Sequence, residues 1–384
     1  MFLLLLACSG GPDDTSEAHS GHNSAAAQDC IDAWSDQLTE PDLDGPDTQI
    51  HGTATFDGAQ IWVAWNRPND FNTFDVFLSR LGCDGSVEID PIAVTEGEDN
   101  ELDPVLAVSG EHLLVAWIAS TQSSGLAIRY RLYDLSGQPT TEVIPLAAER
   151  NGTVVTGNAT LPRLAALPDG FVLSGSWGHE DATGFQAFAV EINPDGSLRG
   201  EGQDAELDTE FSQTAVDVAV HEGATVLAWQ EDSVTSTAPT AWQTPLGSTA
   251  TALGDPGARP ALLSTDDGLW SAWDTDTGIV WVRLPSGEDI ALDLPSFSHS
   301  ARMAAWRDGA AVVTMSIEDG IYNALNLSTI TTDGVVSTTA LQTVAAPSVY
   351  GVDLTVVGGE KAVVIWQEGA SPDFRLRAEW LSLD

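Results

Sequence analysis

A short apolar segment recurs seven times along the chain, each time a few residues after a turn, and each copy ends on a bulky side chain. Residues 113–117 and 225–229 illustrate the pattern, and successive anchor positions lie 52, 60, 52, 44, 42 and 51 residues apart. The seven anchors are Trp65, Trp117, Trp177, Trp229, Trp273, Met315 and Trp366. A recurring unit of roughly 40 to 60 residues made of short strands is typical of a β-propeller blade. The repeat therefore predicts an all-β, seven-bladed propeller, ahead of six- or eight-bladed alternatives.

Each unit divides into short strands separated by turn residues such as Pro194-Asp195-Gly196, which supply the positive φ of tight hairpins. We expect the anchors to pack between neighbouring blades, because tryptophan buries readily. We expect no amphipathic helix anywhere in the chain. The predicted blades span residues 48–96, 103–148, 155–208, 211–253, 257–294, 298–344 and 347–384.

The last unit ends after its third strand, which would leave an open sheet edge. Residues 30–47, starting with the segment from Cys30 to Thr39, precede the first unit and are well placed to supply the missing strand. That placement carries Cys30 to the outer rim near Cys83, in a turn of the first blade. The sequence predicts a Cys30–Cys83 disulfide that locks the closure, with two unpaired thiols as the alternative.

The chain carries 57 acidic and 14 basic residues, a formal net charge of −43. Nucleic acid is excluded as a partner because phosphate binding needs a basic surface. No cluster of Lys and Arg offers a site for anionic lipids. The charge favours solubility at a salty or extracellular surface, and the alternative is an acidic surface that collects divalent cations.

Leu5-Leu6-Ala7-Cys8 resembles the bacterial lipobox, in which the cysteine is diacylated and becomes the new N-terminus. The resemblance implies that residues 1–8 are a signal remnant, that Cys8 is lipidated, and that the lipid is the chain's only membrane contact. Ser9 in place of Asp resembles the outer-membrane sorting pattern, which implies the bacterial outer membrane or cell surface. A signal peptide normally has a basic start, so we expect the natural start to lie upstream. The alternative is an accidental leucine-rich start. Residues 9–29, rich in Ser, Gly, Ala and Asp, are expected to form a disordered tether.

Residues 161–171 read Leu-Pro-Arg-Leu-Ala-Ala-Leu-Pro-Asp-Gly-Phe. This stretch resembles bacterial propeller repeats with the pattern Pro-x-Val-Ala-x-Leu followed by Asp-Gly-Gly-Phe-Val-Val-x-Trp. The resemblance covers residues 48–384 and implies a bacterial surface lipoprotein built on a propeller. It indicates the fold much more than the function, since such repeats occur in adhesin-like, secreted and other surface proteins.

Ionisable residues recur six to nine positions before the glycine turn of each unit, on the face that carries the channel mouth. They are His51, Asp103, Arg163, Asp217, Arg259, Arg302 and Asp353. One interpretation is a ring of ion pairs, since buried charges need partners. The other is a polar pocket in which the arginines hold a carboxylate, sulfate or phosphate group of a ligand.

Acidic loop ends on the same face could bind Ca²⁺ weakly, although solvated loops explain them equally; we expect no other cofactor and no metal centre. They lie at residues 178–181, 230–232, 274–276 and 367–368. The sequence shows no nucleophile elbow, P-loop or zinc motif. We therefore expect a monomeric, lipid-anchored, non-enzymatic binding propeller for an anionic glycan or a protein ligand. The alternative is a carbohydrate-active hydrolase or lyase that uses the Arg/Asp cluster.

Overall fold

The computed structural model describes most of the chain between residues 25 and 383. The described ranges are 25–39, 49–121, 125–150, 153–155, 159–178, 184–205, 211–232, 239–254, 256–294, 297–318, 321–341, 349–369 and 374–383. Within them, no helix is long and apolar enough to cross a membrane.

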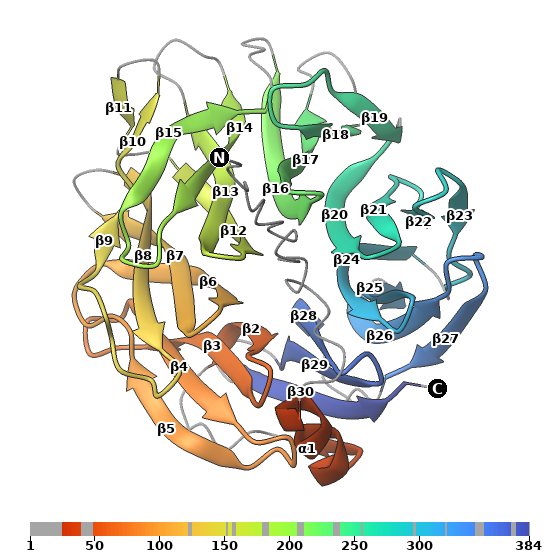
Figure 1. Cartoon of the computed structure of the whole chain (residues 1–384), viewed down its shortest axis with the longest axis horizontal. Helices are drawn as coiled ribbons and strands as arrows, with labels where there is room; N and C mark the ends of the chain where they lie inside the picture. Colours follow the sequence, from red (N-terminus) through yellow and green to blue (C-terminus); the bar gives the residue numbers. More distant parts are fainter. Residues whose placement is uncertain are drawn as a thin grey trace, which may run out of the picture.

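Seven four-stranded antiparallel sheets in these ranges form the blades of a propeller around a central axis (Figure 1). The seven-bladed prediction is confirmed. The first three blades are β2 (Ile50–Phe56), β3 (Ile61–Pro68), β4 (Phe74–Leu81) and β5 (Val87–Ala93); β6 (Asn100–Ser109), β7 (His112–Thr121), β8 (Gly125–Asp134) and β9 (Ile144–Pro145); and β12 (Ala159–Leu167), β13 (Gly170–Gly178), β14 (Phe185–Ile192) and β15 (Leu198–Asp204). A small hairpin, β10 (Ala148–Arg150) and β11 (Thr153–Val155), stands outside the blades.

The remaining blades follow in chain order, and the seventh takes its outer strand from the N-terminal part of the chain. They are β16 (Ser212–His221), β17 (Ala224–Asp232), β18 (Thr240–Pro245) and β19 (Thr251–Gly254); β20 (Ala258–Thr265), β21 (Gly268–Asp274), β22 (Val280–Arg283) and β23 (Asp289–Ala291); β24 (Phe297–Trp306), β25 (Gly309–Glu318), β26 (Ile321–Ile330) and β27 (Val336–Ala340); and β28 (Val349–Val357), β29 (Lys361–Glu368), β30 (Arg375–Ser382) and β1 (Gln37–Thr39).

The N-terminal strand closes the ring as predicted. β1 pairs with β30 from Gln37↔Trp380 to Thr39↔Ala378. The disulfide between Cys30 and Cys83 is also confirmed, with their Cα atoms 5.3 Å apart. It therefore ties the closing segment to the first blade.

The part of the closing segment that carries Cys30 is a helix, α1 (Ala25–Ala33), so the expectation of no helix was wrong, as was the tether assignment of residues 25–29. Alanine-rich sequence favours a helix, yet nine residues are marginal alone, so tertiary contacts must stabilise this one. Cys30 is buried against Cys83 and Val357, with Ile31 packed beside them.

The core lies between neighbouring blades, and six of the anchors are buried tryptophans, as predicted. Trp65, for example, packs among residues of the first blade and Val363 and Ile365 of the seventh. Apolar contact from blade to blade therefore continues around the closure, and β28 lies beside β2.

Candidate functional site

The first strand of every blade contains a register shift near its start, where two residues stand opposite one. The first residue of each shift has a positive φ: His51 (53°), Asp103 (50°), Leu161 (54°), Ala215 (47°), Arg259 (44°), Ser300 (57°) and Gly351 (55°). Residues with a side chain rarely adopt this conformation. Its recurrence in all seven blades shows that the fold requires this bulge, so the strained backbone is not itself a sign of function.

These bulges align the blades and correct the predicted single ring of seven ionisable residues. His51, Asp103 and Arg259 occupy the bulge position itself. The other four lie two residues later, at Arg163, Asp217, Arg302 and Asp353. The spacing misled because the distance from the bulge to the glycine turn varies between blades. It is seven residues from His51 to Gly58 but nine from Leu161 to Gly170.

Polar side chains next to the anchors link neighbouring blades, a feature that the sequence analysis missed. In four blades the residue after the tryptophan accepts a hydrogen bond from the backbone N–H of the next blade's bulge residue. The links are Asn66 to Asp103 (3.2 Å), Gln230 to Arg259 (3.2 Å), Asp274 to Ser300 (3.0 Å) and Gln367 to His51 (3.3 Å). The recurring Trp-Asn, Trp-Gln and Trp-Asp pairs were the available signal.

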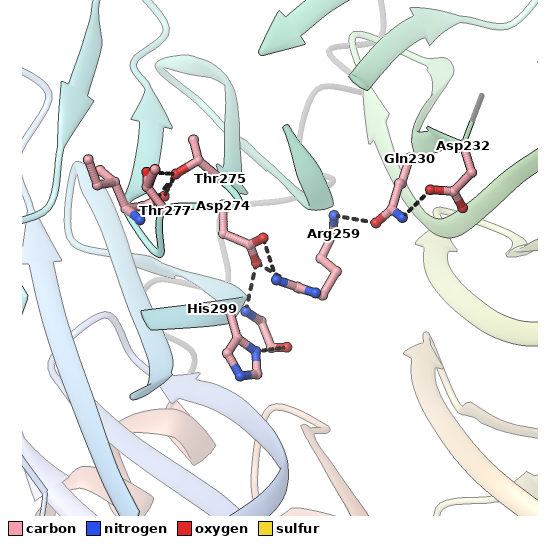
Figure 2. Close-up of polar contacts among 9 residues, drawn as sticks. Gln230, Asp232, Arg259, Asp274, Thr275, Thr277 and His299 are labelled. Carbon is pink, nitrogen blue, oxygen red and sulfur yellow. Dashed lines mark hydrogen bonds and ion pairs between the residues drawn. The ribbon is translucent and has the colours of Figure 1, made fainter. Parts of the chain in front are cut away.

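Arg259 does not line the channel cavity, contrary to prediction. Its guanidinium forms a bidentate ion pair with Asp274 of the same blade, Nε–Oδ2 2.9 Å and Nη2–Oδ1 2.6 Å (Figure 2). The Asp274 side chain is fully buried, and this burial raises its pKa even though Arg259 opposes the shift. Arg259 therefore neutralises a buried carboxylate of the fold.

Some of the acidic loop ends considered for Ca²⁺ carry side chains that take part in these hydrogen bonds between blades. Figure 2 shows Gln230 between Arg259 and Asp232, and its Nε2 donates to Asp232 at 2.7 Å. The Asp274 carboxylate already accepts hydrogen bonds from the Arg259 guanidinium and the Ser300 backbone N–H. No group of three or more His, Cys, Asp or Glu side chains that could hold a metal occurs in the described ranges, and residues 179–181 lie outside them.

The central channel encloses a cavity of about 880 Å³ that extends along the inner strands from their bulges to their hairpins. Pockets of roughly 300 to 1,000 Å³ are typical of small-ligand sites. Six of the seven predicted residues line it: His51, Asp103, Arg163, Asp217, Arg302 and Asp353.

Asp217 and Asp353 perform the same structural task in different blades. Asp353 accepts hydrogen bonds from the Ala54 N–H (3.0 Å) and the Thr53 hydroxyl (2.6 Å) of the next blade. Asp217 accepts one from the Leu262 N–H (2.8 Å), at the position equivalent to Ala54. Burial raises the pKa of Asp217, although the charges of Arg163 and Arg302 oppose this. Both carboxylates therefore join inner strands to each other.

His51 and Asp103 form a pair on the cavity wall, with Nδ1 and Oδ1 2.8 Å apart. Their side chains are 37% and 35% exposed, so both are accessible from the cavity. Burial pushes the pKa of Asp103 upward, but His51 and the more distant Arg163 outweigh it and hold that pKa below its ordinary value.

Arg163 and Arg302 differ from the other charged residues of the channel. Each donates a hydrogen bond to the carbonyl of its preceding residue, Pro162 (2.9 Å) and Ala301 (3.1 Å). Neither forms an ion pair with any carboxylate in the described part of the chain. The positive charge of Arg163, with burial second, lowers the pKa of Arg302 to about 10. The charges of Asp217 and Asp353 oppose this shift without cancelling it. The two arginines, three blades apart, thus line one cavity, and the predicted closed ring of ion pairs does not form.

No protein-family model matches the sequence, and no curated protein matches it. Solved structures do resemble it in fold. A protein of unknown function from Dyadobacter fermentans has a TM-score of 0.55 at 8% identity, covering 89% of this chain and 96% of its own. The polysaccharide lyase Uly1 has a TM-score of 0.56 at 10% identity, covering 86% and 90%. Trypanosoma rangeli sialidase has a TM-score of 0.48 at 8% identity, covering 87% of this chain and 55% of its own. At these identities the likeness extends to the propeller fold alone.

Proposed function

We propose that this chain is a lipid-anchored binding propeller of the bacterial cell surface whose central channel holds an acidic group of a ligand between Arg163 and Arg302. The observation that carries the proposal is that both arginines line the cavity and neither forms an ion pair with a carboxylate of the described residues, although the charge of Asp217 acts on both and that of Asp353 on Arg302. Two like charges in one cavity repel each other, and Asp217 and Asp353 offset only part of the effect on Arg302, since its pKa still falls below its ordinary value. A carboxylate or sulfate group would relieve the repulsion and accept charge-assisted hydrogen bonds, which guanidiniums donate in pairs.

The rest of the cavity suits an anionic glycan. The hydroxyl of Thr55 lines it and can exchange hydrogen bonds with sugar hydroxyls. The hydroxyls of Thr53, Ser264 and Thr265 also line it, but they already bond to Asp353, His221 and Gly268. The far end carries the exposed carboxylates of Asp266, Asp267 and Asp308, which disfavour the approach of an anion there. An acidic group would therefore enter from the end that carries the bulges.

Two observations support a surface location. The Cys30–Cys83 disulfide fits an oxidising compartment outside the cytoplasm. Leu5-Leu6-Ala7-Cys8 supplies the lipidation motif, although it lies outside the described residues. Mass spectrometry of the membrane-extracted protein should find an acylated N-terminal cysteine, and an unmodified chain in the cytosol would contradict the location.

A carbohydrate-active enzyme is the second candidate. The specific observation in its favour is the His51–Asp103 pair, which places an acid–base group in the same cavity as the arginines. The fold that this chain shares with a polysaccharide lyase is compatible with that candidate.

Calorimetric titration tests the binding proposal, with sulfate, galacturonate oligomers and neutral galactose oligomers as probes. We expect the galacturonate oligomers to bind the unmodified chain and Arg163→Gln or Arg302→Gln to abolish binding. Arg283→Gln is the matched control, because Arg283 pairs with Asp289 on the outer strands of its blade, away from the channel. The proposal fails if no acidic probe binds, or if neutral oligomers bind equally well.

A further inference from the structure

The cavity contains one side chain arranged as a general base. Nδ1 of His51 lies 2.8 Å from Oδ1 of Asp103, and the backbone N–H of His51 donates a hydrogen bond to the Gln367 side chain. In the tautomer that carries its proton on Nδ1, the lone pair is on Nε2, and the adjacent carboxylate stabilises the imidazolium that forms when Nε2 takes up a proton. The pair therefore provides a base at the channel wall with a carboxylate beside it.

The other titratable groups nearby are less suited to this task. Asp217 and Asp353 accept backbone hydrogen bonds that join the blades. His299 does not line the cavity, and burial together with the charge of Arg259 lowers its pKa to about 4. His51 is thus the one histidine that lines the cavity among the described residues, and the exposed carboxylates of Asp266, Asp267 and Asp308 lie at the far end.

Arg163 lies on the first strand of the blade that follows the blade of Asp103, and it lines the same cavity. The cavity therefore presents a base with Arg163 in the next blade but one, and a second guanidinium, Arg302, three blades further around the channel. Resting on the proposed binding of an acidic group, we propose that the channel cleaves uronate-containing glycans by β-elimination, with His51 as the general base.

The chemistry balances without a co-reactant. The arginines neutralise the carboxylate of the bound uronate, which acidifies the C–H bond on the adjacent carbon, C5. His51 Nε2 takes that proton, and the electron pair forms a double bond between C5 and C4. The bond from C4 to the glycosidic oxygen breaks, and the departing oxygen takes up a proton from the imidazolium or from water.

Hydrolysis fits the cavity less well. It generally needs two carboxyl groups, one to protonate the leaving oxygen and one to attack or to activate water. Asp217 and Asp353 are engaged with backbone N–H groups, and Asp103 is engaged with His51. One base and two arginines in the same cavity match elimination.

The test is incubation of the intact protein with polygalacturonate and with a glucuronate-containing polysaccharide, followed by ultraviolet absorbance of the conjugated unsaturated product. We expect product from the unmodified chain and a loss of at least about 100-fold in His51→Gln, within the usual range for removing a general base. His51→Gln should still bind galacturonate oligomers in calorimetry. His112→Gln is the control, because His112 begins β7 and does not line the cavity.

The outcomes separate the two proposals. Binding of galacturonate oligomers without any product would overturn the elimination and leave the binding function standing. Product formation unchanged in His51→Gln would overturn the role of this histidine. Absence of both binding and product would remove the binding function as well.

Discussion

Replacing Arg259 with alanine should destabilise the protein and leave anion binding intact, the reverse of what replacing Arg302 should do. The side chain of Asp274 is fully buried and depends on Arg259 for two of its hydrogen bonds, at 2.9 and 2.6 Å. Breaking a fully buried ion pair costs about 3–5 kcal/mol. Since the Arg259 side chain is 41% exposed, solvent screens the pair and about 2–3 kcal/mol is the better expectation.

That loss is measurable by thermal unfolding. With an unfolding entropy of about 2.1 cal/mol/K per residue, 384 residues give about 0.8 kcal/mol/K, so 3 kcal/mol lowers Tm by about 4 °C. Arg283→Ala is the matched control, because Arg283 makes the same bidentate contact with Asp289, which is 35% exposed. A pair of that kind contributes about 0–1 kcal/mol.

The pH dependence gives a second check with a definite sign. Burial raises the pKa of Asp274 in the folded state, so its ionised form is disfavoured there, and removing Arg259 raises that pKa further. An acid whose folded pKa is raised stabilises the fold below its unfolded pKa and loses this contribution as pH rises through the folded pKa. The loss of unfolding free energy in Arg259→Ala should therefore be smaller near pH 4 than near pH 8. A variant with unchanged Tm that no longer binds galacturonate oligomers would refute the structural role of Arg259.

Three further outcomes are expected. Replacing Cys30 and Cys83 with serine should lower the free energy of unfolding by up to about 4 kcal/mol, since the disulfide closes a loop of 53 residues; denaturant titration measures this, and no change would mean that α1 and β1 hold the closure without it. Burial, opposed by Arg129 and Trp117, raises the pKa of Glu101 to about 7 from 4.5, so stability should fall between these pH values by on the order of 2–3 kcal/mol. Glu101→Gln should flatten that part of the pH–stability curve, and an unchanged curve would argue against the shift. Because the net charge is −43, salt should screen the repulsion of an acidic ligand, so its association rate should rise between about 10 and about 150 mM salt. Stopped-flow mixing measures this rate, and a rate that falls with added salt would contradict the expectation.

The sequence predicted the blades and their closure because both depend on local pattern. Short apolar strands, glycine turns and buried tryptophans recur with each blade, and a missing last strand requires a partner from elsewhere in the chain. The pairing of Cys30 with Cys83 followed from that closure.

The alignment of the channel residues could not be predicted, because it depends on backbone conformation. Leu161 and Ala215 hold the same left-handed bulge as His51 and Asp103, yet nothing in their side chains signals a positive φ. The predicted ring of seven ionisable residues consequently mixed the bulge position with the position two residues after it.

The ion-pair partner of Arg259 could not be predicted from the sequence either. Asp274 lies 15 residues further along, and only the register of β20 against β21, which pairs Ala258 with Asp274, brings the two side chains together. Helix α1 was missed because its nine residues carry little periodic signal and depend on packing against Cys83 and Val357.

The central claim is that Arg163 and Arg302 together hold an anion in the channel. Selenate is a suitable probe because its selenium scatters anomalously and its shape resembles sulfate. In crystals soaked with selenate, we predict an anomalous peak inside the channel within hydrogen-bonding distance of both guanidiniums, and its loss in crystals of Arg302→Gln. Peaks confined to the protein surface, with none between Arg163 and Arg302, would contradict the claim.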